Sequence, residues 1–314
     1  MKRKRSLSRK NPSFPQKILF VSAVFLISFL TYRTYIKAVP TLRIPGPKLK
    51  NATQNSPGFP IPKPVVELPP FVVPKSKPPL AMRSKIWTPD KPKLVFVIDD
   101  IGNNQKNVDF FRSLNNHVTY AILPRRKYSE YFRRLSHETG AEVILHQPME
   151  SSLGKIPGPG LITKEMKSKQ VKEILAANLN TVPDYVGANN HMGSKGSSDL
   201  ALMGTILKEL KKRGAFFLDS RTTSRIVSEK LGEGLGIPVL KRDVFLDNVD
   251  DREKIRIQIQ EMARVARQKG LAIGIGHDRH NTLSVVYEEI PELMSEGFQI
   301  VSLSEVVKHS RRNQ

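Results

Sequence analysis

The stretch LVFVIDDIGNN, residues 94–104, indicates the fold class and raises the main question about function. An apolar, β-branched run typical of a buried strand ends in two adjacent acids, Asp99 and Asp100, and Gly102 and two asparagines follow. Neighbouring side chains along a regular strand point to opposite faces. Both acids can therefore serve one site only if the strand stops there and the backbone turns, and Gly102 would permit such a bend.

Strand-like and helical segments alternate from residue 93 to residue 314. The strand-like runs are LVFVIDD, VTYAILP, EVILHQP, YVGANNH, AFFLDSR, VLKRDVFLD, LAIGIGH and FQIVSLS. Helical segments such as residues 197–214 and 251–270 lie between most of them. Short apolar strands that alternate with helices predict a parallel sheet covered by helices. Seven or eight such units favour an α/β fold of the distorted (β/α) barrel type over an open sheet.

Charge is distributed unevenly along the chain, whose net charge is +22. Residues 1–93 hold 19 Lys and Arg against 2 acids, whereas the rest holds 51 − 19 = 32 basic and 29 − 2 = 27 acidic residues. The basic excess therefore belongs to the N-terminal region and not to a binding face on the folded part. We expect no nucleic-acid partner, because the electrostatic footprint of one is missing.

The N-terminus predicts a membrane anchor. A basic tail, residues 1–17, precedes an apolar segment, residues 18–36, which as a helix would rise about 28 Å, roughly the thickness of a hydrocarbon core. A cleaved signal peptide is the competing interpretation, but no small-x-small cleavage site follows the apolar run. We expect a single-pass anchor in a bacterial inner membrane, with the basic flank in the cytoplasm and residues 93–314 in the periplasm or outside.

The next segment, residues 37–92, contains 14 of the 23 prolines. Such a composition predicts an extended, semi-rigid linker that offers no core. We therefore expect that its removal leaves the stability of the domain nearly unchanged. The whole chain lacks cysteine, which excludes thiolate nucleophiles and cysteine zinc sites, so any metal must be held by His, Asp or Glu.

Polar side chains gather at the ends of the predicted strands, where parallel β/α folds place their functional groups. A single histidine in such a position is more often structural, but three histidines with an acid pair on one rim indicate an Asp/His metal site. The strand ends carry Asp99 and Asp100, His146, His191, Asp219, Asp247 and His277.

These motifs resemble a known family. VIDDIGNN is similar to the paired-aspartate first motif of NodB-type polysaccharide deacetylases, and GAEVILHQPME resembles their second motif. The run LHQPME, GPGLIT, NNHMGS, FFLDSRTT, RDVFLDN and GIGH resembles the divergent polysaccharide deacetylase branch across the domain. The resemblance implies a NodB-like distorted barrel and metal-dependent removal of N-acetyl groups from a glycan.

The resemblance also implies a division of roles. Asp99 corresponds to the base, and Asp100 to the acid that binds a divalent metal, for which zinc is the expected ion. His146 and His191 are the predicted neutral imidazole ligands, and His277 is the predicted general acid. Asp219 or Asp247 would orient His277.

Two departures from the family pattern bear on activity. Glu150 stands where ordinary members carry a second histidine, and it is interpreted as a ligand, a partner of a ligand or a solvated loop acid. NNHMGS replaces the usual arginine-containing motif, so the use of His191 as a ligand is our inference from this chain. The alternative function is a catalytically weak barrel that serves as a glycan-binding or envelope-assembly module. The sequence does not indicate the oligomeric state.

Overall fold

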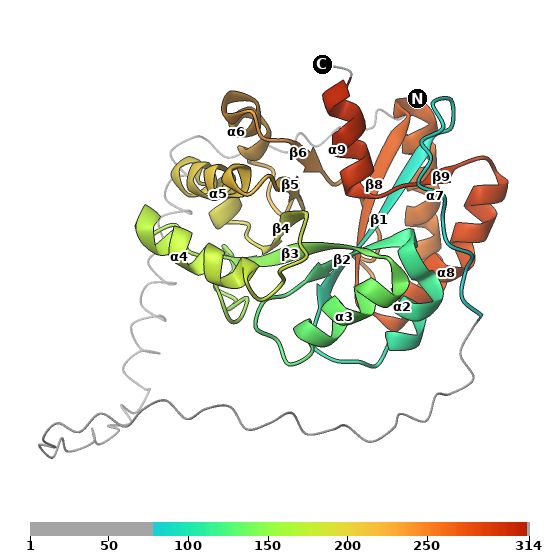
Figure 1. Ribbon diagram of the computed structural model, residues 1–314, viewed down its shortest axis with the longest axis horizontal. Coiled ribbons are helices and arrows are strands. Elements are labelled where there is room, and N and C mark those ends of the chain that lie inside the picture. The colour runs from blue at the N-terminus through green and yellow to red at the C-terminus, as the bar shows by residue number, and fades with distance from the viewer. Residues whose placement is uncertain (1–77, 313–314) are drawn as a thin grey trace, which may run out of the picture. The chain divides into compact units, whose positions relative to one another are not determined.

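The computed structural model describes residues 78–312. Strands and helices alternate in it, as expected, and Figure 1 shows the strands at the centre with helices around them. The strands are β1 (Lys93–Ile101), β2 (Val118–Ile122), β3 (Glu142–Met149), β4 (Gly187–Met192), β5 (Phe216–Asp219), β6 (Val239–Lys241), β7 (Val244–Phe245), β8 (Leu271–His277) and β9 (Gln299–Ile300). The α-helices are α2 (Val108–Leu114), α3 (Ser129–Thr139), α4 (Ser168–Leu179), α5 (Leu200–Lys212), α6 (Ser228–Leu235), α7 (Arg252–Lys269), α8 (His280–Ser295) and α9 (Leu303–Arg312), with short 3-10 turns at Asn115–His117 and Gly196–Ser198.

The sheet is parallel throughout and curls into an incomplete barrel. Its order is β6-β5-β4-β3-β2-β1-β8-β7, and β9 adds a short pairing to the start of β1. The two edge strands, β6 and β7, are consecutive in the chain, and only residues 242–243 separate them. Among the described residues no strand pairing joins β6 to β7. The predicted distorted (β/α) barrel is confirmed, and it has a seam between these two strands.

Alternation along the strands divides the apolar residues into two clusters. Leu94, Phe96 and Ile98 of β1 belong to the cluster that the helices α2–α8 share, whereas Val95 and Val97 belong to a second one. Among the described residues this second cluster draws only on strands and on the segment from Val301 through α9. It therefore fills the barrel interior, and α9 closes the end where the strands begin. Because side chains alternate, Asp99 continues the interior row of Val95 and Val97.

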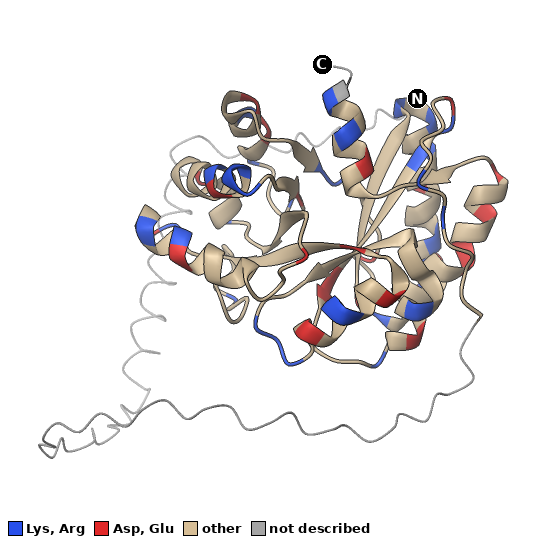
Figure 2. Ribbon diagram, in the orientation of Figure 1, with Lys and Arg blue, Asp and Glu red and all other residues tan. Residues whose placement is uncertain are grey.

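Helix boundaries follow local chemistry. Asp251 caps α7 by accepting a hydrogen bond from the backbone N–H of Lys254 at 3.0 Å, and Asp199 caps α5 in the same way. Gly270 ends α7 in the left-handed conformation, a position that favours glycine because it has no Cβ. Figure 2 shows basic and acidic residues interspersed on the outer helices.

The part of the proline-rich segment that the structure describes, residues 78–92, packs on the domain. It has neither helix nor strand, but Arg83 is only 9% exposed. Its guanidinium lies 2.6 Å from the Glu305 carboxylate, and its backbone N–H donates to Asn116 Oδ1 at 2.8 Å. Trp87 stacks on His309 of α9, with ring centroids 3.9 Å apart. The folded unit thus begins before residue 93, because side chains of this segment fill sites on the domain surface.

Replacing Arg83 by methionine should lower the free energy of unfolding by about 2 to 3 kcal/mol, because a largely buried charge pair loses one partner. Urea denaturation of the full-length protein measures the change. The matched control is Arg112→Met, which breaks an ion pair to Glu138 whose two side chains are 48% and 57% exposed. The control should cost less than about 1 kcal/mol. Equal effects of the two substitutions would show that the 78–92 segment contributes no more than a surface contact.

The N-terminal predictions fall elsewhere in the chain. Within residues 78–312 no helix is both long and apolar enough to cross a bilayer. The predicted tail, residues 1–17, the predicted anchor, residues 18–36, and most of the predicted linker lie outside the described residues.

Candidate metal centre and acid–base pair

The backbone turn that two adjacent acids require occurs at Asp100 itself. Asp100 has φ +64°, a left-handed conformation that is uncommon for residues other than glycine. The register between β1 and β2 shifts between Ile98 and Ile101, which marks an irregularity at this point. Gly102 follows with φ +115°, and a Cβ there would meet Ser129 Oγ at 2.9 Å. The turn breaks the strand alternation, so that the carboxylates of Asp99 and Asp100 both approach His146.

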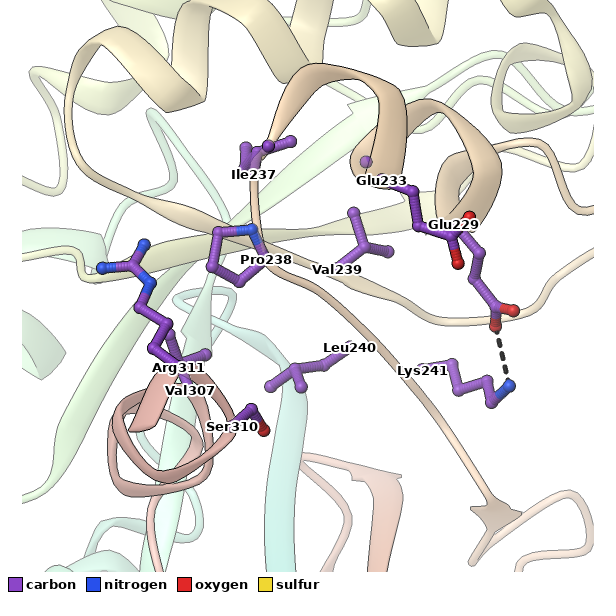
Figure 3. Close-up of a pocket in the computed structure, with 12 residues that line it drawn as sticks. Glu229, Glu233, Ile237, Pro238, Val239, Leu240, Lys241, Val307, Ser310 and Arg311 are labelled. Atoms are coloured by element: carbon purple, nitrogen blue, oxygen red, sulfur yellow. Dashed lines mark ion pairs between the residues drawn. The ribbon is translucent and has the colours of Figure 1, made fainter. Parts of the chain in front are cut away.

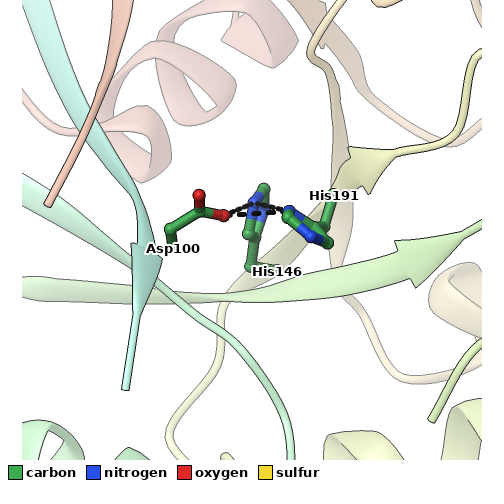
Figure 4. A group of neighbouring side chains, drawn as sticks. All are labelled: Asp100, His146 and His191. Carbon is green, nitrogen blue, oxygen red and sulfur yellow. Dashed lines mark hydrogen bonds and ion pairs between the residues drawn. The ribbon is translucent and has the colours of Figure 1, made fainter. Parts of the chain in front are cut away.

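Three potential ligand atoms converge at this end of the barrel (Figure 4). Asp100 Oδ1 lies 3.2 Å from His146 Nε2 and 2.9 Å from His191 Nδ1, and the two imidazole nitrogens are 3.1 Å apart. His146 comes from β3 and His191 from β4, which pair in register beside β2 and β1. The structure therefore brings together the three predicted ligands from three different strands.

The chemistry of this group fits a divalent cation. A tetrahedral zinc ion with bonds of about 2.0–2.1 Å holds its ligand atoms about 3.3 Å apart, close to the three distances found here. Asp100 Oδ1 is buried and accepts no hydrogen bond of acceptable angle from the described residues, although two imidazole nitrogens face it. Such a carboxylate oxygen requires a positive partner. Asp100, His146 and His191 would supply one oxygen and two nitrogens, a set suited to zinc and similar ions.

Asn189 orients two members of the site. Its side-chain oxygen accepts from His146 Nδ1 at 2.7 Å, and its amide donates to Asp99 Oδ1 at 2.8 Å. The amide orientation follows from its partners, because the carboxylate can only accept. Nδ1 of His146 therefore carries the hydrogen, and Nε2 presents its lone pair toward Asp100 and His191. This is the arrangement that a histidine ligand needs.

Sequence reasoning missed Asn189 as a site residue, although a signal was present. Asn189 lies two residues before His191 on the same strand, so the two side chains share a face.

Asp99 lies beside the three ligand atoms and not among them. It is 4% exposed, and its Oδ2 is 3.6 Å from His146 Nε2. Burial raises the pKa of Asp99, while the charges of His146 and His277 act in the opposite direction. For Asp100 burial alone would also raise the pKa, but the adjacent imidazoles of His146 and His191 outweigh it and lower the pKa strongly. The environment thus makes Asp99 the more basic of the two adjacent carboxylates.

His277 and Asp247 form a pair on the other side of Asp99. His277 is aligned with Asp99 across the β1–β8 pairing, and its Nδ1 lies 2.8 Å from Asp247 Oδ1. Asp247 is fully buried, and its Oδ2 accepts from the His277 backbone N–H and from Thr282 Oγ1, each at 2.7 Å. Burial by itself lowers the pKa of His277, but the hydrogen bond and charge of Asp247 outweigh it and raise the pKa. Nδ1 is occupied by Asp247, which leaves Nε2 for a substrate.

Asp219 does not join this pair. Phe216 and Leu218 of β5 face the barrel interior, and Phe217 faces the helices, so alternation turns Asp219 to the helix side. Its carboxylate accepts from the Arg221 backbone N–H at 2.7 Å and from Ser228 Oγ of α6. Of the two acids that we considered for orienting His277, the structure places Asp247 in contact with it and Asp219 in the turn after β5.

Glu150 lies in the loop after β3, outside the group of Asp100, His146 and His191. Its Oε1 pairs with Lys195 Nζ, and its Oε2 accepts from the Lys164 backbone N–H at 3.1 Å. Of the three interpretations left open for Glu150, these contacts match a loop acid that ties neighbouring loops together.

A cavity of about 650 Å³ lies elsewhere on the domain, between the α6–β6 segment and α9 (Figure 3). Ile237, Pro238, Val239, Leu240 and Val307 line it together with polar residues, among them Glu229 and Lys241, whose charged groups lie 3.0 Å apart. Asp100, His146 and His191 do not belong to its lining.

Comparisons with known proteins agree with the fold and the motifs. The profile of a family described as divergent polysaccharide deacetylase matches residues 96–307. The uncharacterized protein YibQ of Escherichia coli strain K12 is 34% identical over 202 residues, which cover 64% of this chain and 63% of YibQ, less than two thirds of that relative. An uncharacterized protein of Haemophilus influenzae strain ATCC 51907 is 32% identical over 220 residues, covering 70% of this chain and 78% of the relative. The crystal structure of the uncharacterized protein ATU2773 from Agrobacterium tumefaciens C58 has a TM-score of 0.68 at 21% identity, covering 71% of this chain and 92% of that one.

Proposed function

The chain belongs to the divergent polysaccharide deacetylase family, and from this premise we propose that it is a metal-dependent hydrolase that removes N-acetyl groups from a cell-envelope or exported polysaccharide. One observation carries the proposal. The barrel rim brings Asp100, His146 and His191 together, with the carboxylate of Asp99 beside them and the His277–Asp247 pair beyond it. A glycan-binding module has no need of a buried free carboxylate next to three potential metal ligands.

Asp100, His146 and His191 would hold the metal, with zinc as the expected ion. When bound, a divalent cation supplies Lewis acidity toward an amide carbonyl and lowers the pKa of water. Asp99 takes the proton of the attacking water, because its carboxylate is buried and does not belong to the group that would bind the metal. His277 in its protonated form gives a proton to the departing amine nitrogen.

Two residues position this machinery. Asp247 holds the ring of His277 and favours its protonated form, in the way that a carboxylate orients a catalytic imidazole. Asn189 holds His146 and Asp99 at once, which fixes the spacing between a ligand and the base. Asn189 is the first residue of the NNHMGS motif, which stands where the family carries an arginine-containing motif.

We also propose that residues 18–36 anchor the protein in a bacterial inner membrane and that the barrel works on the periplasmic side. The support is the sequence alone, a basic flank before an apolar segment without a cleavage site. Protease added to spheroplasts should then release the domain. A soluble mature protein with a new N-terminus near residue 38 would contradict the anchor.

The test of the proposed activity combines metal content with acetate release. Purified full-length protein should contain about one divalent metal per chain and release acetate from at least one N-acetylated glycan in a panel of chitooligosaccharides, peptidoglycan and exported polysaccharides. Chelation should abolish acetate release, because the amide carbonyl then lacks a Lewis acid. Added zinc should restore it.

Stoichiometric metal and tight glycan binding without any acetate release would instead favour the alternative, a catalytically weak barrel that acts as a glycan-binding or envelope-assembly module. Acetate release that survives complete metal removal would contradict the metal-dependent mechanism.

A further inference from the structure

A polar pocket of about 420 Å³ opens at the seam of the barrel, where β5 and β6 end. We call it the seam pocket. Its lining residues come from the loop after β5 and from the two-residue link between β6 and β7: Arg221, Thr222, Thr223, Ser224, Arg242 and Asp243.

The seam pocket adjoins the Asp/His site through direct contacts. Arg242 Nε donates to the Ser220 backbone oxygen at 2.8 Å, and Ser220 Oγ accepts from Asn189 Nδ2 at 3.2 Å. The Arg242 guanidinium also lies 4.8 Å over the ring of Phe245, whose ring in turn packs 5.4 Å from that of His277. Phe245 thus separates Arg242 of the pocket from His277 on one side, and Ser220 and Asn189 separate it from His146 on the other.

The pocket carries a net positive charge. Arg221 and Arg242 contribute two guanidinium groups, and residues 222–224 contribute three hydroxyls. The single acid, Asp243, is already engaged, because its Oδ2 accepts from the Ile273 backbone N–H at 3.0 Å and its Oδ1 lies 3.4 Å from Lys269 Nζ. Two guanidinium groups beside hydroxyls match a carboxylate or phosphate, which they can bind with charge-assisted hydrogen bonds.

The backbone presents Arg221 at a conformational cost. Arg221 has φ +50°, and Asp219 Oδ1 holds this turn by accepting the Arg221 N–H. The Arg221 side chain is exposed at the pocket, and no hydrogen bond or ion pair of its guanidinium is found within the described residues. A left-handed conformation is strained for arginine and persists only where its surroundings determine it. The buried carboxylate of Asp219 thus helps to hold the turn that places Arg221 at the seam pocket.

We propose that the seam pocket binds an oxyanion group, a carboxylate or phosphate, on the sugar that neighbours the N-acetylated sugar under attack. The inference rests on the proposed deacetylase function and specifies its substrate class as an acidic glycan. A neutral N-acetylglucosamine polymer offers no anion to Arg221 or to the remaining donors of Arg242, whose Nε and Nη2 donate to the Ser220 and Arg221 backbone oxygens, and it is the poorer substrate.

Two hexasaccharides that share N-acetylglucosamine but differ in charge test the pocket. Hyaluronan hexasaccharide alternates N-acetylglucosamine with glucuronate, and chitohexaose is neutral. Binding is measured by isothermal titration calorimetry on the full-length protein with Asp99→Asn, which should slow any turnover of the probes by about 10² to 10⁴. We expect hyaluronan hexasaccharide to bind about tenfold or more tightly than chitohexaose, with an affinity that falls as sodium chloride is raised.

Arg221→Gln in the same protein should weaken hyaluronan hexasaccharide about tenfold and leave chitohexaose unchanged. The matched control is Arg225→Gln, an exposed arginine of the same loop that does not line the pocket, and it should change neither affinity. Arg221→Lys should recover part of the loss, because it keeps the charge but not the planar fork. Displacement of the hexasaccharide by inorganic phosphate but not by glucuronate would identify phosphate as the preferred oxyanion.

The outcomes separate the pocket from the activity. The seam pocket is overturned if the two hexasaccharides bind with equal affinity, if the two glutamine substitutions have equal effects, or if hyaluronan hexasaccharide does not bind. If Arg221-dependent binding is found but wild-type protein releases acetate from no glycan, the deacetylase proposal fails and the pocket stands. If acetate is released from chitohexaose and hyaluronan hexasaccharide with the same kcat/KM, the activity stands and the pocket fails.

Discussion

Replacing Asp99 by asparagine should lower acetate release by about 10² to 10⁴, the usual contribution of a general base, while the metal content stays near that of the wild type. The substitution keeps the shape of a side chain that is 4% exposed, and its amide oxygen can still accept from Asn189. It removes the ability to take a proton. The metal content is measured by elemental analysis and the rate by acetate release on the same samples.

Asp100→Asn should produce the opposite pattern, with most of the metal lost and the rate falling in proportion. A neutral amide is a poorer ligand than a carboxylate for a hard or borderline dication. Asparagine also tolerates the left-handed conformation at φ +64° better than most residues, so the backbone turn is preserved. His146→Ala or His191→Ala should resemble Asp100→Asn, because each removes one ligand atom of the same cluster.

Metal content and acetate release are measured separately, so that loss of metal can be told from loss of turnover. A circular-dichroism melt of each variant shows whether it is folded. Loss of metal in Asp99→Asn with retention in Asp100→Asn would reverse the two roles. Wild-type metal and wild-type rate in both variants would make the acid pair structural, and the proposed function would fail with it.

His277→Gln should also lower acetate release by about 10² to 10⁴ without loss of metal, because it removes the proton donor to the leaving amine. Asp247→Asn should have a smaller effect on the rate and a distinct effect on its pH dependence. Asp247 raises the pKa of His277, and only protonated His277 can act as the acid. Activity is therefore lost as pH rises through this pKa, and without the charge of Asp247 the loss should begin at lower pH.

The pH–rate profile of kcat/KM measures this shift. Asp219→Asn is the matched control, because Asp219 is a buried acid on the same rim that faces α6. It should leave the alkaline limb in place even if it lowers stability. An alkaline limb that is the same in wild type and Asp247→Asn would contradict the assignment of Asp247 as the residue that positions and charges His277.

The alternation of strand-like and helical segments, together with residue type, was enough to predict much of the domain. Apolar strands alternating with helices predicted the distorted barrel, and strand ends predicted where Asp99, Asp100, His146, His191 and His277 would meet, because parallel strands end on one rim. The start of the folded unit was harder to predict. Proline-rich composition shows that residues 78–92 build no helix or strand, but it does not show that Arg83 finds Asn116 and Glu305, which lie 33 and 222 residues further along the chain.

The sequence by itself determined the family, the barrel and the inventory of acids and imidazoles, because these follow from local period and from motifs. Only the tertiary structure decided which acid serves which histidine. In FFLD every residue before Asp219 is apolar, so alternation alone does not say which face is interior, and the choice between Asp219 and Asp247 depends on how the strand lies between helices and barrel. The same holds for the acid pair. Asn189 of β4 contacts Asp99 of β1 and His146 of β3, and these contacts arise only where strands distant in sequence meet.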